Sequence, residues 1–194
     1  MNYSDGQNRK FILVQLPEKC EERSEAYRNG YKDICQIGED RIRRAGESIL
    51  QDFAEKTAQI EIGGIVPSDP DIGFKVFMLD KSSFYEWNES GDESLFEGTI
   101  REDRSEEDVL YEVMLKWGLE LSLPVERIVI ADYEMYSVAK NALICCMKED
   151  LTVEVLEAIR DLHPDRVLLL DSILNDSLKL NAAHILGTEK LRTV

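Results

Sequence analysis

The sequence predicts an α/β fold, in which one strand and long helices precede a C-terminal α/β layer of mixed strands. Residues 11–16, FILVQL, form a short continuous apolar run that is typical of a strand buried on both faces. Residues 21–58 have apolar side chains at the three- to five-residue steps of helices. Residues 127–187 then alternate between apolar runs and helical patterns, which indicates an α/β layer with at least one parallel crossover.

In the N-terminal third, Pro17 ends the first predicted strand, and Gly30 is expected to divide the helical stretch into a short helix and a longer one. The turn-rich residues 61–73, EIGGIVPSDPDIG, favour a linker. We therefore predict two domains, with residues 1–62 in the first and residues 63–194 in the second.

The middle third begins with residues 74–80, FKVFMLD, whose alternation predicts a half-buried strand. Residues 80–104 have no clean period and many acids, so we expect an acidic insertion there. Ser105 is expected to begin a helix, with Asp108 in the capping-box position. Its apolar stripe consists of Val109, Leu110, Val113, Met114, Trp117 and Leu121.

The last third gives the most regular pattern. Strands are predicted at RIVIADYE (127–134), AKNALICCMK (139–148) and RVLLLD (166–171). A helix at 152–162 is expected to begin at Thr152, and a final helix is expected to end at Gly187. Asp171 or Ser172 is the expected N-cap of that final helix, although Asp171 also ends a buried strand, where α/β enzymes place functional groups.

The charge distribution argues against nucleic acid as a direct ligand. The chain has 39 acidic and 23 basic residues, and residues 61–126 alone carry 17 acidic against 5 basic residues. Affinity for phosphates is built from cationic contacts, so such a field repels DNA, RNA and anionic membranes. Neither a membrane-spanning apolar stretch nor a signal peptide is visible, and we expect a cytoplasmic protein.

The cysteines and histidines do not predict a metal site or a catalytic centre. The four cysteines lack CxxC spacing, and Cys145 and Cys146 are expected to be buried thiols in preference to a redox pair. His163 is expected at a helix end and His184 on a helix face. No nucleotide-binding or hydrolase motif occurs, so we predict no catalytic residue and no metal ligand.

Two further groups have both a structural and a functional interpretation. Arg41, Arg43 and Arg44 are expected to pair with Glu39, Asp40 and Glu47 on a charged helix face, the alternative being a phosphate contact. Trp87 and Trp117 are expected to be core or interface anchors. Gln15, at the end of the first strand, occupies the place where a nucleotide-binding sheet meets a ribose.

Four segments resemble Mod subunits of type III restriction–modification systems, which are adenine-specific DNA methyltransferases that use S-adenosylmethionine. They are NRKFILVQLPEKCEERSEAYRNGYKDICQIGEDRIRRAGESI, DIGFKVFMLDKSSFYEW, DVLYEVMLKWGLELSLPVE and RVLLLDSILNDSLKLNAAHIL. The resemblance spans about residues 8–187. In this family the catalytic DPPY motif and the cofactor loop FxGxG precede the FILVQ strand, and neither motif occurs in this sequence.

The resemblance implies that the chain is the C-terminal portion of such an enzyme. Residues 1–62 would then be the remnant of a cofactor-binding, methyltransferase-type sheet. Gln15 would approach the ribose hydroxyls of S-adenosylmethionine, and Leu16 and Pro17 would border its adenine. Without the two motifs we expect no catalysis and no cofactor bound by this chain alone.

The role that remains by resemblance is subunit association. The expected partners are the missing N-terminal half, another Mod copy, a Res-type subunit, or a second copy of this chain. The alternative is a stand-alone dimerisation module without cofactor, whose interface contains Trp117 and Leu121. A third hypothesis is an independent enzyme that uses Asp171 with Asp176 or His163.

Overall fold

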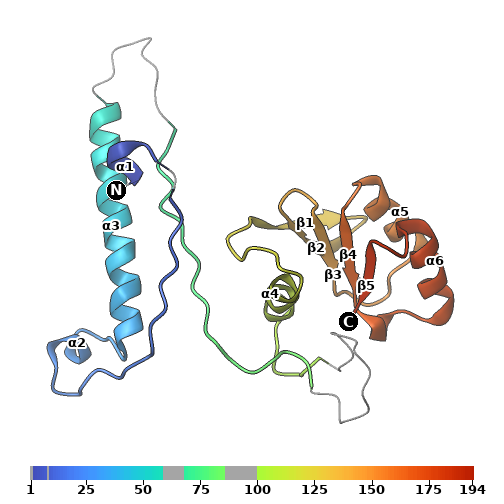
Figure 1. Ribbon diagram of the computed structural model, residues 1–194, viewed down its shortest axis with the longest axis horizontal. Coiled ribbons are helices and arrows are strands. Elements are labelled where there is room, and N and C mark those ends of the chain that lie inside the picture. The colour runs from blue at the N-terminus through green and yellow to red at the C-terminus, as the bar shows by residue number, and fades with distance from the viewer. Residues whose placement is uncertain (1, 8, 59–67, 86–99) are drawn as a thin grey trace. The chain divides into compact units, whose positions relative to one another are not determined.

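The computed structural model describes residues 2–7, 9–58, 68–85 and 100–194 (Figure 1). The chain divides into two compact units, Met1–Val76 and Phe77–Val194, which we call unit 1 and unit 2. Each unit has its own local structure and is described by itself. The predicted domain boundary after residue 62 lies outside the described residues.

The described part of unit 1 contains three helices: α1 (Asn2–Asp5), α2 (Glu25–Arg28) and α3 (Ile34–Thr57). Asp33 is the N-cap of α3, and its carboxylate accepts a hydrogen bond from the backbone N–H of Gln36 at 3.0 Å. Gly30 lies between α2 and α3 with a φ of 94°, a left-handed conformation that favours glycine. The predicted division of the helical stretch at Gly30 is confirmed.

Both strands predicted before residue 81 are absent from the structure. Residues 11–16 and 74–80 do not form strands. The β-type pairing described near the first segment is a single isolated bridge between Lys19 and Asp33. A strand forms only where a neighbour takes up its backbone hydrogen bonds, and no described backbone–backbone hydrogen bond reaches residues 11–14 or 76–79. The predicted partial sheet in the N-terminal region is therefore wrong for this chain by itself.

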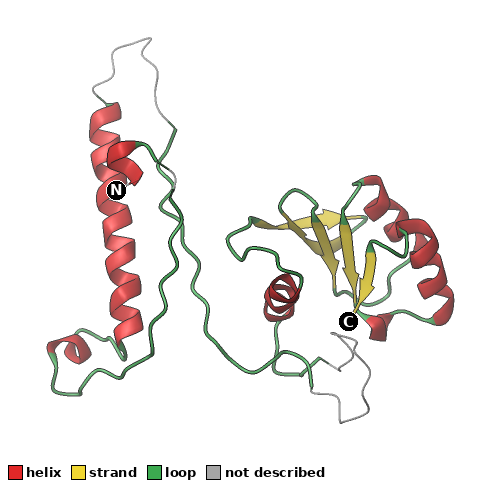
Figure 2. Ribbon diagram, viewed as in Figure 1, coloured by secondary structure: helices red, strands yellow, loops and turns green. Residues whose placement is uncertain are grey.

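Unit 2 is built on a mixed sheet, which confirms the predicted α/β fold (Figure 2). The first three strands form an antiparallel meander, and the next two are added in parallel. The strand order is β1 (Val125–Ile130), β2 (Tyr133–Val138), β3 (Leu143–Cys146), β4 (Arg166–Leu169) and β5 (Leu191–Thr193).

Three helices cover this sheet in two layers: α4 (Glu106–Lys116), α5 (Val153–Asp161) and α6 (Asp176–Leu186). Figure 1 shows α4 on one side of the sheet and α5 and α6 on the other. Ile144 of β3 packs in the cluster with α5 and α6, whereas the next residue, Cys145, packs in the cluster with α4. This alternation is expected of a strand that is buried on both faces. The helix α5 connects β3 to its parallel neighbour β4, so the predicted crossover is confirmed.

The helix ends of unit 2 follow the predicted signals in part. Ser105 and Asp108 form the predicted capping box at the start of α4, with both reciprocal hydrogen bonds present. Gly187 ends α6 with a φ of 88°, as predicted. The N-cap of α6 is Asn175, whose side chain accepts a hydrogen bond from Leu178 N–H at 2.8 Å, and not Asp171 or Ser172 as predicted. The reason is that a short 3-10 turn, η1 (Asp171–Ile173), intervenes between β4 and α6.

The acidic insertion is described only at its two ends, because residues 86–99, including Trp87, lie outside the described part of the chain. An isolated bridge joins Phe84 to Ile100, and Arg104 pairs with Asp80 at 2.8 Å. The Glu112 carboxylate of α4 accepts hydrogen bonds from the Ser82 hydroxyl at 2.6 Å and from Ser83 N–H at 2.5 Å. These contacts fix both ends of the insertion close to α4.

Candidate interaction site

Residues 11–16 of unit 1, which we call the apolar segment, expose almost all of their side chains. The exposed fractions are Phe11 60%, Ile12 90%, Leu13 71%, Val14 91% and Leu16 72%. In an extended chain successive side chains point to opposite sides, so both faces of this segment are exposed. Residues 11–14 form one of the two runs of four consecutive large apolar residues that the described chain leaves exposed to water, the other being residues 76–79.

The cost of this exposure is large compared with the stability of a domain. Burying one such side chain is worth about 1.5–3 kcal/mol, and a typical domain is stable by only about 5–15 kcal/mol. Folded monomers rarely leave contiguous apolar patches of this kind unless the patch binds something. The apolar segment is therefore the strongest candidate interaction surface of unit 1.

The backbone of the segment offers unused hydrogen-bonding groups. Among the described contacts, the Leu16 carbonyl accepts from Glu18 N–H at 2.8 Å, and the Gln15 carbonyl accepts from the Cys35 thiol at 3.7 Å. No described backbone–backbone hydrogen bond reaches residues 11–14. An extended backbone with free donors and acceptors is a template for pairing with another strand.

The three residues predicted to contact a cofactor all lie at the end of this segment. The Gln15 side-chain amide donates a hydrogen bond to the adjacent Leu16 carbonyl at 3.2 Å, and the Leu16 side chain is largely exposed. Pro17 is exposed as well. Neither of the two cavities described below is lined by Gln15, Leu16 or Pro17.

A second exposed apolar stretch begins unit 2. Phe77 contacts Tyr111 edge-on, with ring centroids 4.9 Å apart, but Met78 and Leu79 are almost fully exposed. This stretch coincides with the second predicted strand that is not formed. Thus both segments before residue 81 that have the sequence pattern of strands are left exposed.

Two of the three arginines singled out on α3, Arg43 and Arg44, are paired within the helix as the structural interpretation predicted, whereas no ion pair of Arg41 is described. Arg43 pairs with Glu39 at 2.9 Å and Arg44 pairs with Asp40 at 2.7 Å. The Tyr31 hydroxyl donates a hydrogen bond to Asp40, and this bond, together with Arg44, lowers the pKa of the Asp40 carboxyl. These ion pairs account for Arg43 and Arg44, so a phosphate contact is not needed to explain their presence on α3.

The remaining residues singled out in the sequence do not form a catalytic group. Asp171 pairs with Lys179 at 2.8 Å, and no described hydrogen bond or ion pair joins it to Asp176 or His163. His163 directly follows the C-cap of α5, at the helix end as predicted, and His184 lies on the exposed side of α6. Within the described ranges, no cluster of three or more His, Cys, Asp or Glu side chains could hold a metal ion.

The adjacent thiols of β3 are buried, which confirms the structural interpretation of this pair. Cys145 and Cys146 have no exposed surface, and burial raises the pKa of the Cys145 thiol well above its usual value. A thiol that stays protonated is a poor nucleophile and a poor metal ligand.

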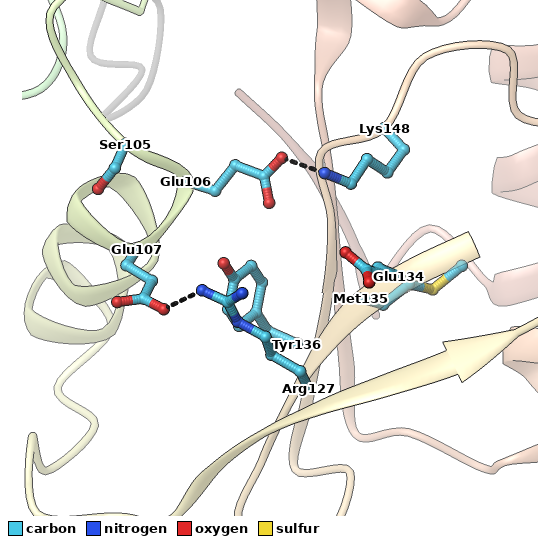
Figure 3. A pocket seen from close by; sticks show the side chains of 8 residues that line it. All are labelled: Ser105, Glu106, Glu107, Arg127, Glu134, Met135, Tyr136 and Lys148. Atoms are coloured by element: carbon cyan, nitrogen blue, oxygen red, sulfur yellow. Dashed lines mark hydrogen bonds and ion pairs between the residues drawn. The ribbon is translucent and has the colours of Figure 1, made fainter.

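A cavity of about 350 Å³ lies between the N-terminus of α4 and strands β1 and β2 (Figure 3). Four of its five charged side chains pair across it, with Glu106 2.7 Å from Lys148 and Glu107 2.6 Å from Arg127, and Glu134 has no described ion pair. Burial raises the pKa of the Tyr136 hydroxyl at its floor. Because these two ion pairs join the first turn of α4 to residues of the sheet and of the segment after β3, the arrangement attaches α4 to the sheet.

A second cavity, of about 240 Å³, lies where α4 ends beside the β5 edge of the sheet. It is lined by Trp117, Arg166, Glu189, Lys190 and Arg192. Arg166 lies over the Trp117 ring, with its guanidinium carbon 5.5 Å from the ring centroid. Sequence analysis missed this group, although the alternation of Lys190 and Arg192 around an apolar residue is a signal for two cations on one side of a strand.

The Trp117 and Leu121 side chains, predicted at the interface of a stand-alone dimer, pack against the α4 cluster of the core. Both are half-buried within unit 2. They are therefore anchors of the fold.

No protein-family model matches the sequence, and no curated protein is significantly similar to it. None of the helices in the described ranges is both long enough and apolar enough to cross a membrane.

Proposed function

We propose that this chain is the C-terminal part of an adenine-specific DNA methyltransferase of the type III Mod kind. In this proposal it is not catalytically competent alone, it is cytoplasmic, and it serves subunit association. The resemblance over about residues 8–187 suggests the family. The single observation that supports an association role is the exposed apolar segment, residues 11–16.

The exposure of both faces of this segment restricts the kind of partner. A partner that covers one face would leave alternate side chains in water. Strands that are buried on both faces belong to sheets with helices on either side, and such strands have continuous apolar sequences. A methyltransferase half that supplies neighbouring strands and helices would satisfy both the side chains and the backbone of residues 11–14.

The cofactor does not fit the residues of this chain by themselves. Among the described residues, the Gln15 amide contacts only the neighbouring Leu16 carbonyl, and Leu16 is 72% exposed. S-adenosylmethionine would supply the transferred methyl group in the complete enzyme. In the proposal the chain alone binds none, because Gln15, Leu16 and Pro17 need the rest of the sheet around them.

The proposed partners are proteins. The missing N-terminal half comes first, followed by another Mod copy or a Res-type subunit. The formal charge of −16 disfavours direct DNA binding. A second candidate function, self-association as a stand-alone dimerisation module, is served by the same exposed segment.

Co-purification and a methylation assay test the proposal. The chain is mixed with a separately expressed N-terminal part of a Mod subunit that carries the DPPY and FxGxG motifs. The expected result is a stable complex that methylates DNA, whereas each part alone is inactive.

The variant Leu13→Asp should abolish the complex, because it places a charge in the middle of the buried strand. Leu180→Asp is the matched control, since Leu180 is also exposed, at 73%, but lies on α6 of unit 2. No complex with the wild-type chain, or equal loss in both variants, would contradict the proposal.

A titration with S-adenosylmethionine tests whether the isolated chain has an intact cofactor site, which neither candidate function predicts. Neither the fragment nor the dimerisation module should bind it alone. Saturable binding by the isolated chain would contradict both. The mass of the isolated chain in solution then distinguishes them, because the dimerisation module must be a dimer without any other partner.

A further inference from the structure

Three cationic side chains meet at the β5 edge of unit 2. The parallel register pairs Val167 with Leu191 and Leu168 with Arg192. Arg166 therefore lies opposite Lys190 in register, and Arg166, Lys190 and Arg192 all belong to the same face of the sheet as Leu168. This is the face that α4 covers as far as Trp117.

The described partners of these three cations are backbone carbonyls and an aromatic ring, which carry no net charge, so the positive charges are not balanced by them. Lys190 donates to the Pro164 carbonyl at 3.1 Å, and Arg192 donates through Nη1 to the Leu191 carbonyl at 2.7 Å and the Thr188 carbonyl at 3.1 Å. Arg166 rests on the Trp117 ring. No described carboxylate lies within ion-pair distance of any of the three, although Glu189 also lines the cavity.

Most basic side chains of unit 2 are paired with described acids, and these three are not. Residues 77–194 contain 25 acidic and 12 basic residues. Seven of the basic side chains form ion pairs with described acids, namely Arg101, Arg104, Lys116, Arg127, Lys148, Arg160 and Lys179. Three of the other five gather at one cavity. In so acidic a unit, unpaired cations that converge on one point indicate an anionic ligand.

We propose that this cavity binds the phosphate group of a small molecule. The three cations and Glu189 give a formal charge of about +2, which matches a phosphate group that carries roughly −1.5 to −2 at pH 7. Arginine guanidinium groups are suited to bidentate contact with phosphate oxygens. A cavity of about 240 Å³ accommodates a phosphate group and little more.

The surroundings favour a small phosphate over a nucleic acid. A polyanion would bring further phosphates against the acidic surface of the unit, whereas a single phosphate fits within the cationic patch. The site belongs to unit 2 alone and does not depend on the proposed association role of the apolar segment.

Isothermal titration calorimetry of the full chain, at constant ionic strength adjusted with chloride, tests this site. The probes are inorganic phosphate, adenosine monophosphate and adenosine. Saturable binding of the first two and none of adenosine is expected. Similar affinities for the two would identify the phosphate alone as the ligand, and tighter binding of the monophosphate would identify a phosphate ester.

Variants of the cationic side chains test the assignment of the site. Arg166→Gln and Arg192→Gln should each weaken binding about tenfold or more, because a charge-assisted contact is lost. Arg166→Lys, which retains the charge but not the planar fork, should be intermediate. Lys81→Gln is the matched control, since Lys81 is an exposed cation without a described ion pair elsewhere in the unit, and it should leave binding unchanged.

The proposal is overturned by three results. One is the absence of saturable phosphate binding. Another is adenosine binding as tightly as the monophosphate. The third is an equal loss of affinity in Lys81→Gln and Arg166→Gln, because attraction to the overall charge would then explain the binding. Circular dichroism of each variant verifies that the exposed substitutions leave the fold intact.

Discussion

Unit 2 and unit 1 use similar apolar sequences in opposite ways. In unit 2 the run Leu143–Cys146 forms β3, which has a strand on each side, a helix layer on each face and no exposed side chain. In unit 1 the run at residues 11–16 is just as apolar, yet it is extended, unpaired and exposed. The comparison shows that an apolar run specifies a buried strand only together with the elements that bury it.

The largest expected difference between the units concerns side-chain truncation. Leu168→Ala in β4 should lower the free energy of unfolding by about 2–5 kcal/mol, because it leaves a cavity in a fully buried core. Leu13→Ala should change it by less than about 0.5 kcal/mol, because Leu13 contributes little to the isolated fold. Urea denaturation measures both. Similar losses would show that the apolar segment is already buried in the isolated chain.

Acid should lower the free energy of unfolding of unit 2 by protonating the Glu112 carboxylate. Although burial by itself raises the pKa of this carboxyl, hydrogen bonds from Ser82, Ser83 and Lys116 lower it to about 2 from the usual 4.5. The stabilisation is therefore complete above about pH 4.5 and is lost as the pH falls towards 2, with an upper limit of about 3 kcal/mol.

Glu112→Gln should remove this acid-dependent part of the unfolding free energy, which denaturation curves between pH 2 and 6 would show. Glu157→Gln, at an exposed position of α5, is the control and should retain the wild-type pH dependence. A wild-type dependence in Glu112→Gln would mean that its carboxylate does not hold the end of the acidic insertion against α4.

The N-caps of unit 2 should differ in strength. Ser105→Ala removes a hydroxyl that accepts from Asp108 N–H at 3.2 Å and should cost about 1 kcal/mol. Thr152→Ala is the matched comparison, because the Thr152 side chain makes no cap hydrogen bond with the backbone of α5. Its cost should be clearly smaller in the same denaturation experiment, and a larger cost would contradict the capping-box assignment.

Thiol labelling compares the burial of the cysteines in the two units, and the difference expected here is the smallest of these expected differences. Cys145 and Cys146 are fully buried in β3, whereas Cys20 and Cys35 of unit 1 are only half-buried. A thiol reagent should therefore modify Cys20 and Cys35 while the native fold protects the other two. Mass spectrometry of labelled peptides measures this, and rapid labelling of Cys145 would contradict a closed core in unit 2.

The sequence was sufficient to predict the features that depend on local signals. The capping box at Ser105, the division at Gly30, the stop at Gly187 and the buried pair in β3 all follow from short patterns. The hairpin between β1 and β2 was missed, because its turn places Ala131 and Asp132 at positive φ without the glycine or asparagine that usually marks such a turn. The three-residue strand β5 was too short to leave a periodic pattern.

Other features could not be predicted, because they depend on contacts that are distant in the sequence. The apolar segment was predicted as buried because its composition is that of a core strand, but composition does not say which chain supplies the neighbours. The cavity at Trp117 joins the end of α4 to Arg166, Lys190 and Arg192, and only the sheet register brings these together. The pairing of Arg43 and Arg44 with acids one turn away was predictable from the spacing alone.

Hydrogen–deuterium exchange of residues 11–16 tests the central claim most directly. In the isolated chain these backbone amides should exchange nearly as fast as in an unfolded peptide, while those of β3 and β4 are protected. Adding an N-terminal methyltransferase part should protect residues 11–16 and leave β3 and β4 unchanged. Strong protection of residues 11–16 in the isolated monomer, or none in the mixture, would contradict the account, and protection that rises with the chain's own concentration would favour the dimerisation module.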